Sequence, residues 1–156
     1  MITIQRPGQQ PLDIEYLLID YEGTLASDGR VHPKAKDKIN LLSKRIKVFI
    51  FTNGEKASVE ERLRKVNAEM ICLAGSEASR QKLDLLRQLG PGKTVAIGNG
   101  QDDAAMIEEA GLGICVIGKE AAAGETLRRA DLVVTNILDA LDFLLKPLRQ
   151  KATLGL

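Results

Sequence analysis

Three short apolar runs in this chain each end abruptly in small or acidic residues, and this pattern constrains the fold more than any other feature. The runs are LLIDYEGT at 17–24, VFIFTNG at 48–54 and VAIGNGQDD at 95–103. Such runs are typical of parallel strands buried on both faces, and these folds place their chemistry at the carboxyl ends of the strands. We therefore expect an α/β protein with a site at one edge of a parallel sheet.

The rest of the chain alternates between β-like and helical periodicity. Residues 2–4 and 12–14, separated by a turn region at Pro7 and Gly8, predict a short N-terminal β-hairpin. The remaining predicted elements are strands at 16–20, 47–52, 69–75, 94–98, 113–118 and 132–135, and helices at 33–45, 57–66, 78–89, 102–110, 121–129 and 136–145. This order predicts a doubly wound parallel sheet, and we expect the tail after Pro147 to fray or to lie on the surface.

Length and charge narrow the class of protein. The 156 residues are 44% hydrophobic and 28% charged, which suits one core, so we expect a single domain over residues 1–156. A net charge of +1 with interleaved signs argues against a nucleic-acid partner. No apolar stretch approaches the roughly 20 residues of a membrane span, and we expect no membrane partner and a cytoplasmic protein. Cys72 and Cys115 lie in apolar runs without metal-ligand spacing.

Side chains suited to phosphate chemistry lie at the ends of the predicted strands. Asp20 ends the first apolar run, where a carboxylate can attack phosphorus or hold a divalent cation. Thr52, followed by Asn53 and Gly54, offers a hydroxyl and backbone amides to phosphate oxygens. Lys82 opens a predicted helix and can neutralise charge shared by Asp20 and a phosphoryl group.

Two turns complete the candidate site. Gly23 and Thr24 allow a tight turn that aims N–H groups at an anion, and GNGQDD at 98–103 supplies the oxygen ligands that Mg²⁺ prefers. Each feature also has an ordinary structural reading: a βα turn often precedes a helix capped by a residue such as Asp102 or Asp103, and a lysine that opens a helix is usually solvated. Their joint occurrence at strand ends favours a phosphoryl-transfer site.

These stretches resemble the signature motifs of the haloacid dehalogenase superfamily. DYEGTLASDG resembles its nucleophile loop, FTNG its second motif, and KLDLLRQLGPGKTVAIGNGQDDAAMI its lysine-to-acidic-loop segment. The resemblance spans roughly residues 15–145. Within the superfamily it is nearest to the phosphorylation core of P-type ATPases and to small soluble P-type-ATPase-like hydrolases. It implies the corresponding Rossmannoid fold and a phosphatase-type hydrolase with Mg²⁺ as cofactor.

The resemblance also implies a role for each matching residue. Asp20 would be the nucleophile and a metal ligand, and the backbone carbonyl of Glu22 would be a second metal contact. Thr52 and Lys82 would bind and stabilise the phosphoryl group. Asn99 and Asp103 would occupy the acidic-loop positions near Mg²⁺. The implied reaction is attack by Asp20, followed by hydrolysis of the aspartyl-phosphate.

Two positions depart from the family pattern. Glu22 stands where phosphatases of the superfamily usually carry the aspartate that serves as acid and base, and its extra methylene shifts the carboxyl group by about 1 Å, enough to slow turnover roughly a hundredfold. Asn99 stands where an aspartate commonly binds the metal, so metal affinity should fall unless Asp102 or Asp103 compensates. Weak activity is therefore part of the expectation.

The spacing of the motifs bears on the substrate. Only about 22 residues lie between Thr24 and Lys47, and about 27 between Gly54 and Lys82, which leaves no room for the cap domain that selective members of the superfamily carry. We expect an open site whose phosphorylated substrate is a macromolecule, or a small molecule covered by a neighbouring copy in a homo-oligomer. We do not expect ATP-driven ion pumping, because these residues include no counterpart of the nucleotide-binding and membrane parts of a transport ATPase.

Three functions are compatible with these residues. The favoured one is a Mg²⁺-dependent capless phosphohydrolase that works through an aspartyl-phosphate on Asp20. The alternative is a catalytically weak or inactive relative that binds metal or phosphate, or regulates a protein partner. A receiver-type phospho-acceptor domain fits poorly, because it needs an acidic pair after its first strand, whereas the acidic cluster at 102–103 falls late.

Overall fold

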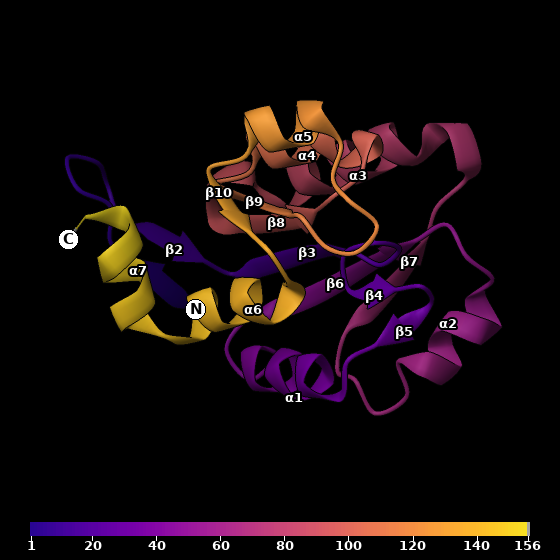
Figure 1. Cartoon of the computed structure of the whole chain (residues 1–156). Coiled ribbons are helices and arrows are strands. Elements are labelled where there is room, and N and C mark those ends of the chain that lie inside the picture. The colour runs from indigo at the N-terminus through magenta and orange to yellow at the C-terminus, as the bar shows by residue number, and fades with distance from the viewer. Residues whose placement is uncertain (156) are drawn as a thin grey trace.

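The computed structural model describes residues 1–155 and is built around one six-stranded parallel sheet (Figure 1). The strands lie in the order β10-β9-β8-β3-β6-β7. Their bounds are β3 Tyr16–Asp20, β6 Lys47–Thr52, β7 Glu69–Cys72, β8 Thr94–Gly98, β9 Leu112–Val116 and β10 Leu132–Val134. The predicted doubly wound sheet is confirmed, and no cap domain is inserted within the described residues.

The strand order brings the predicted motifs to one place. From β3 the chain crosses to β6 on one side, and later returns to β8 on the other side of β3. The sheet therefore changes winding direction at β3, and in such folds ligands bind outside the carboxyl ends of the strands at this point. Asp20, Thr52 and Gly98 end the three central strands there.

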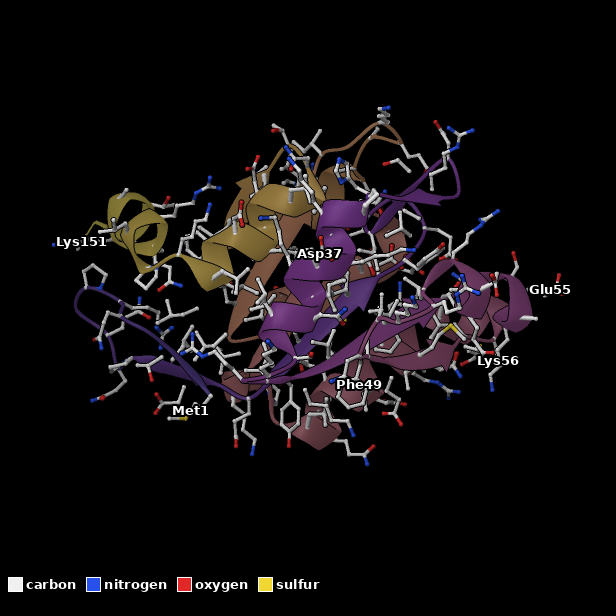
Figure 2. All side chains as sticks on the ribbon, turned by 90° about the horizontal axis from the view of Figure 1, so that it is seen from below. Met1, Asp37, Phe49, Glu55, Lys56 and Lys151 are labelled. Atoms are coloured by element: carbon white, nitrogen blue, oxygen red, sulfur yellow. The ribbon has the colours of Figure 1, made fainter. Side chains whose placement is uncertain are left out.

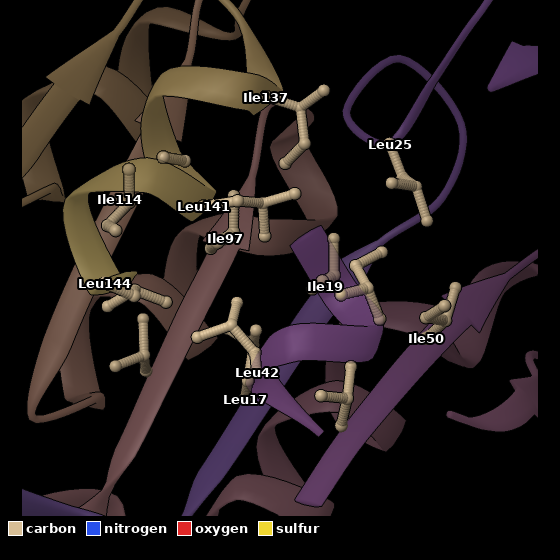
Figure 3. Packing of buried hydrophobic residues seen from close by; sticks show 14 of the residues in the cluster. Leu17, Ile19, Leu25, Leu42, Ile50, Ile97, Ile114, Ile137, Leu141 and Leu144 are labelled. Atoms are coloured by element: carbon tan, nitrogen blue, oxygen red, sulfur yellow. The ribbon is translucent and has the colours of Figure 1, made fainter. Parts of the chain in front are cut away.

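Helices cover both faces of the sheet (Figure 1). One face carries α1 (Pro33–Leu42) and α6 (Ile137–Leu145), and the other carries α3 (Ala78–Leu89) and α4 (Ala104–Glu109), with α5 (Gly124–Arg129) beside α4. Side chains of β3 alternate between these layers: Leu17 and Ile19 join the α1/α6 cluster, seen from close by in Figure 3, while Leu18 packs into the α3/α4 cluster. This burial on both faces explains the continuous apolar runs in the sequence.

Two hairpins flank the sheet. The predicted N-terminal one is confirmed as β1 (Ile2–Ile4) paired antiparallel with β2 (Leu12–Ile14). A second one, β4 (Ala26–Ser27) with β5 (Arg30–Val31), follows the first motif and was not predicted. Its turn is formed by Asp28 and Gly29, with φ values of 51° and 77°. An Asp-Gly pair is the commonest signal for such a tight turn, so the sequence does contain the signal for this hairpin.

The remaining differences from the sequence prediction are at the ends of elements. The helices α1, α5 and α2 (Lys56–Arg62) are shorter than predicted, and short 3₁₀ turns precede helices or strands at η1 (Gly75–Glu77), η2 (Pro91–Lys93) and η3 (Gln101–Asp103). The tail after Pro147 does not fray, because α7 spans Pro147–Leu154 with Pro147 at its first turn. It does lie on the surface, as the other predicted alternative has it, since Gln150 is the one buried residue of this helix. It is anchored by the buried Gln150, whose Nε2 donates to the carbonyl of Phe143 at 2.8 Å. Within residues 1–155 no helix is long and apolar enough to cross a bilayer.

A nearly buried carboxylate links α1 to α6. Asp142 on α6 is 7% exposed, and its Oδ1 lies 2.6 Å from the Nζ of Lys38 on α1. Lys146 and Arg149 approach its Oδ2 at 3.5 and 3.7 Å. Burial by itself would raise the pKa of Asp142, but the hydrogen bond and charge of Lys38, together with Lys146, hold this pKa below its ordinary value.

We predict that Asp142→Asn lowers the free energy of unfolding by about 2 kcal/mol at pH 7. Because the folded-state pKa is depressed, the ionised carboxylate contributes stability above pH of about 4, and this contribution is lost as the pH falls through the lower folded pKa. Urea denaturation of wild type and Asp142→Asn at pH 7 and at pH 3 measures the difference in the free energy of unfolding at each pH. Asp37→Asn, an exposed carboxylate on the outer side of α1 (Figure 2), is the matched control and should change stability by less than about 0.5 kcal/mol. A deficit that stays constant with pH would contradict this account.

Candidate active site

A buried lysine lies at the centre of the candidate site. Lys82 on α3 has no exposed surface, and its Nζ is 3.0 Å from Asp20 Oδ1, 3.1 Å from Asp102 Oδ2 and 2.7 Å from Asp103 Oδ1. The structure thus brings together three of the residues predicted from separate motifs, Asp20, Lys82 and Asp103. Asp102 completes the group.

One ammonium faces three carboxylates, so this cluster carries an excess of negative charge when all are ionised. Burial alone would lower the pKa of Lys82, but the charges of Asp103, Asp20 and Asp102 raise it above its ordinary value, and the ammonium stays protonated. The pKa of Asp20 is raised, first by burial and then by the charge of Asp103, while Lys82 acts in the opposite direction. An ionised Asp20 is therefore favoured by any further positive charge at this edge of the sheet.

Asp103 holds the lysine in place through a rigid turn. Its Oδ2 accepts from the backbone N–H groups of Asn99 and Gly100 at 3.0 Å each, while Oδ1 accepts from Lys82. A Cβ on Gly98 would lie 2.4 Å from the Cγ of Asp103, so only glycine permits this approach. Asp103 was predicted as a metal ligand, and this stays a prediction; in this arrangement each of its oxygens already accepts from a protein group.

Asn99 and Asp20 direct oxygens toward one place. The hydroxyl Oγ1 of Thr24 lies 2.9 Å from Asn99 Oδ1 and 3.3 Å from Asp20 Oδ2. One hydroxyl proton cannot be donated to both, so two acceptor oxygens face each other across Thr24. The orientation of the Asn99 amide is fixed because its Nδ2 donates to the carbonyl of Ala121 at 3.1 Å. Gly23, with φ 77°, leaves room for this amide, since a Cβ there would lie 2.5 Å from Nδ2.

This oxygen pair is the part of the site that fits a hard divalent cation. Carboxylate, amide and backbone carbonyl oxygens are suitable ligands for Mg²⁺, which usually keeps several waters. Within residues 1–155 no three His, Cys, Asp or Glu side chains are grouped to hold a metal ion. A cation at this position would therefore use the side-chain amide oxygen of Asn99 and the backbone carbonyl oxygen of Glu22 in addition to the Asp20 carboxylate.

The second motif forms a small anion-binding nest. The hydroxyl of Thr52 and the backbone N–H groups of Asn53 and Gly54 converge on one oxygen, Oε1 of Glu22. The two N–H distances are each 3.1 Å, and the Gly54 N–H also lies 2.9 Å from Thr52 Oγ1. The predicted phosphate-binding groups are thus together, but the Glu22 side chain fills the place that they surround.

The backbone amides of the first turn do not face an anion. The N–H of Gly23 donates to the carbonyl of Ala26 at 2.8 Å, and the N–H of Thr24 lies 3.4 Å from the carbonyl of Tyr21. Both were predicted to contribute N–H groups to phosphate binding. In the structure these groups close the turn instead, and Thr24 contributes its hydroxyl to the neighbourhood of Asp20 and Asn99.

The loop 117–123 was missed as part of the site. The carbonyl of Ala121 in this loop accepts a hydrogen bond from the Asn99 side chain, and the N–H of Ala123 donates to the Asn99 backbone carbonyl at 2.8 Å. Oε2 of Glu120 accepts from the N–H of Asp28 at 3.1 Å, which joins the loop to the tip of the β4–β5 hairpin. The sequence signal for this loop is weak: a glycine and a run of alanines after the end of a strand.

Comparison with known proteins shows the family of the chain. The family model described as haloacid dehalogenase-like hydrolase matches residues 3–111, more than half of the chain. The chain belongs to the haloacid dehalogenase-like hydrolases. An uncharacterised protein of Methanocaldococcus jannaschii is 48% identical over 82 residues, which cover 51% of this chain and 88% of that protein.

Solved structures of other haloacid dehalogenase-like proteins share the fold. The 3-deoxy-D-manno-octulosonate 8-phosphate phosphatase of Moraxella catarrhalis, solved with magnesium, phosphate and its sugar acid, has a TM-score of 0.71 at 18% identity and covers 91% of this chain and 92% of its own. The cobalt-bound phosphatase of the same kind from Haemophilus influenzae has a TM-score of 0.71 at 17% identity, and the match covers 90% of this chain and 92% of that one. A putative hydrolase of subfamily III A from Legionella pneumophila has a TM-score of 0.71 at 21% identity, and the match covers 92% of this chain and 88% of that one. These likenesses show a shared fold, and the finer similarity to P-type ATPases is not supported.

We predict that Asp20→Asn raises the melting temperature of the metal-free protein at pH 7. The raised folded-state pKa of Asp20 means that the folded protein binds more protons than the unfolded chain, so its stability falls as the pH rises above the ordinary value of 3.8. An uncharged asparagine removes the cost of ionising a buried carboxyl group. The difference in melting temperature between the variant and wild type should therefore become smaller toward pH 4. Thermal unfolding in EDTA measures it.

The same measurement with Mg²⁺ provides the internal control. Added Mg²⁺ should stabilise the wild type more than Asp20→Asn, because binding to the folded state requires the carboxylate. Asp84→Asn, which removes an exposed carboxylate from the same helix as Lys82, should leave the melting temperature nearly unchanged. A lower melting temperature for metal-free Asp20→Asn would show that the charge of Asp20 is fully compensated.

Proposed function

We propose that this protein is a Mg²⁺-dependent phosphohydrolase that works through an aspartyl-phosphate on Asp20. One observation supports this most directly: Asp20 presents one carboxylate oxygen to a buried lysine and the other to the amide oxygen side of Asn99. A nucleophile flanked by a fixed cation and a candidate cation site, next to an anion-binding nest, is the arrangement that phosphoryl transfer requires.

Asp20, Asn99 and the backbone carbonyl of Glu22 are the groups that would hold Mg²⁺. When bound, the ion neutralises negative charge on Asp20 and on the phosphoryl oxygens. We assign Asp103 to the positioning of Lys82 rather than to the metal, because its oxygens accept from Lys82 and from two backbone N–H groups. Asp102, with a side chain 33% exposed, remains close enough to Lys82 to add charge.

In the first step a carboxylate oxygen of Asp20 attacks phosphorus, and the bond from phosphorus to the leaving-group oxygen breaks. Thr52, Asn53 and Gly54 bind the phosphoryl oxygens through the hydroxyl and two N–H groups, and Lys82 balances the charge that builds up. The carboxylic acid of Glu22 gives its proton to the departing oxygen. The product is an aspartyl-phosphate and a free alcohol.

In the second step water attacks the phosphorus of the aspartyl-phosphate. The carboxylate of Glu22 accepts a proton from this water, and the bond between phosphorus and the Asp20 oxygen breaks, which releases inorganic phosphate and restores both carboxyl groups. Glu22 can serve both steps only when its side chain leaves the nest, because there it occupies the position of a phosphoryl oxygen.

A cavity of about 310 Å³ beside Glu22 is the place that we assign to the leaving group. It lies between the β4–β5 hairpin, the start of α2 and the loop 117–123, and Gly54 and Ser58 line it close to the nest. The substrate that fits is a phosphomonoester with a small polar leaving group, or a macromolecule that presents one. A homo-oligomer in which a neighbouring copy covers this edge, and a cytoplasmic location, complete the proposal.

Hydrolysis of p-nitrophenyl phosphate with and without Mg²⁺ tests the proposed function. We expect turnover that EDTA abolishes, and we expect Asp20→Asn to reduce it by at least about a thousandfold, because the nucleophile is lost. Lys82→Met should reduce it as well, and its folding is checked by circular dichroism. Turnover by wild type no greater than that of Asp20→Asn would reject the enzyme and leave the alternative of a metal- or phosphate-binding regulatory protein.

A further inference from the structure

The carboxylate of Glu22 lies in the anion-binding nest of the second motif. Its Oε1 accepts from the Thr52 hydroxyl and from the N–H groups of Asn53 and Gly54, and its Oε2 lies 3.4 Å from the Asn53 N–H. Three donors directed at one oxygen form a concave site of the kind that binds phosphate and carboxylate oxygens. In this structure the nest is therefore satisfied by a side chain of the protein itself.

The length of the glutamate side chain makes this contact possible. An aspartate at position 22 would carry its carboxylate about 1 Å nearer to the backbone, since one methylene is missing. The N–H contacts at 3.1 Å are within hydrogen-bond range, but contacts about 1 Å longer are not. Glu22, one of the two departures from the phosphatase pattern, thus has the side-chain length that reaches the nest.

A phosphoryl oxygen and the Glu22 carboxylate cannot use the nest at the same time. Both are anionic acceptors for the same two N–H groups and the same hydroxyl, and two negative groups in contact repel each other. The cavity of about 310 Å³ that Glu22 shares with Gly54, Ser58 and Arg62 gives the displaced side chain a place to move to.

We propose that Glu22 is an internal competitor that closes the phosphate-binding nest until a phosphate displaces it. The nest is open only in the fraction of molecules in which the side chain has moved away, and the apparent affinity for phosphate falls by that fraction. The same residue thus sets the affinity for the phosphoryl group and, under the proposed function on which this inference builds, supplies the proton once it has been displaced.

Calorimetric titration of the whole protein with inorganic phosphate, in the absence of metal and again with Mg²⁺, tests this proposal. The variant Glu22→Asp keeps the negative charge but is too short to reach the nest. We expect it to bind phosphate about tenfold more tightly than wild type, as a nest open one-tenth of the time requires. Glu22→Gln should also bind more tightly, because its uncharged amide oxygen is a weaker acceptor than a carboxylate.

Glu55→Gln is the matched control, since it removes an exposed carboxylate from the same cavity without touching the nest. It should change the phosphate Kd by less than about twofold. Tighter binding by Glu22→Gln together with wild-type affinity in Glu22→Asp would show simple charge repulsion and overturn the proposal. Unchanged affinity, or no measurable binding, in both Glu22 variants that fold like wild type would overturn it as well.

Binding and hydrolysis separate this inference from the proposed function. If Glu22→Asp binds phosphate more tightly but neither it nor wild type hydrolyses p-nitrophenyl phosphate, the enzyme is rejected and the competitor role stands. If wild type hydrolyses the ester and Glu22→Asp shows no gain in phosphate affinity, the enzyme stands and the competitor role is rejected.

Discussion

The site depends on one constraint, the burial of the Lys82 ammonium. A charged group without exposed surface is costly unless opposite charges surround it, and here three carboxylates do so at 2.7 to 3.1 Å. These carboxylates come from the end of β3 and from the turn after β8, while the lysine comes from α3. Their packing fixes the position of the Asp20 carboxylate and the shape of the turn that carries Asn99. The Asp103 side chain can approach Lys82 in this way only because Gly98 has no side chain to block it.

Much of the fold follows from the sequence because parallel strands buried on both faces leave a strong local signal. The runs that end at Asp20, Thr52 and Gly98 are strands in the structure, and since the ends of adjacent parallel strands share one edge, the approximate position of the site followed from them. The approach of Lys82 to Asp20 was predicted from the joint pattern of strand ends, and its contact with Asp103 was not predicted. A single lysine on a helix has no local feature that distinguishes a buried charge from a solvated one.

What could not be predicted depends on contacts between segments distant in the sequence. The direction of the Glu22 carboxylate is set by N–H groups some thirty residues later, and the orientation of the Asn99 amide by Ala121. The helix α7 is held against α6 by the hydrogen bond from Gln150 to the Phe143 carbonyl, a contact that no periodicity reveals. The β4–β5 hairpin is different, since its signal is local: an Asp-Gly turn at residues 28–29.

The order of the strands has a consequence for how the protein gains and loses its chemistry. β3 lies between β6 and β8. The pairing of β3 with β6 brings Asp20 close to the nest, and the pairing of β3 with β8 brings Asp20 close to the turn after β8. Both pairings join segments distant in the sequence, so loop-closure entropy opposes them until the contacts are made. A nascent or partly opened chain in which β8 has not docked therefore keeps the Asp102 and Asp103 carboxylates away from Asp20, so the complete charge cluster exists only in the finished sheet.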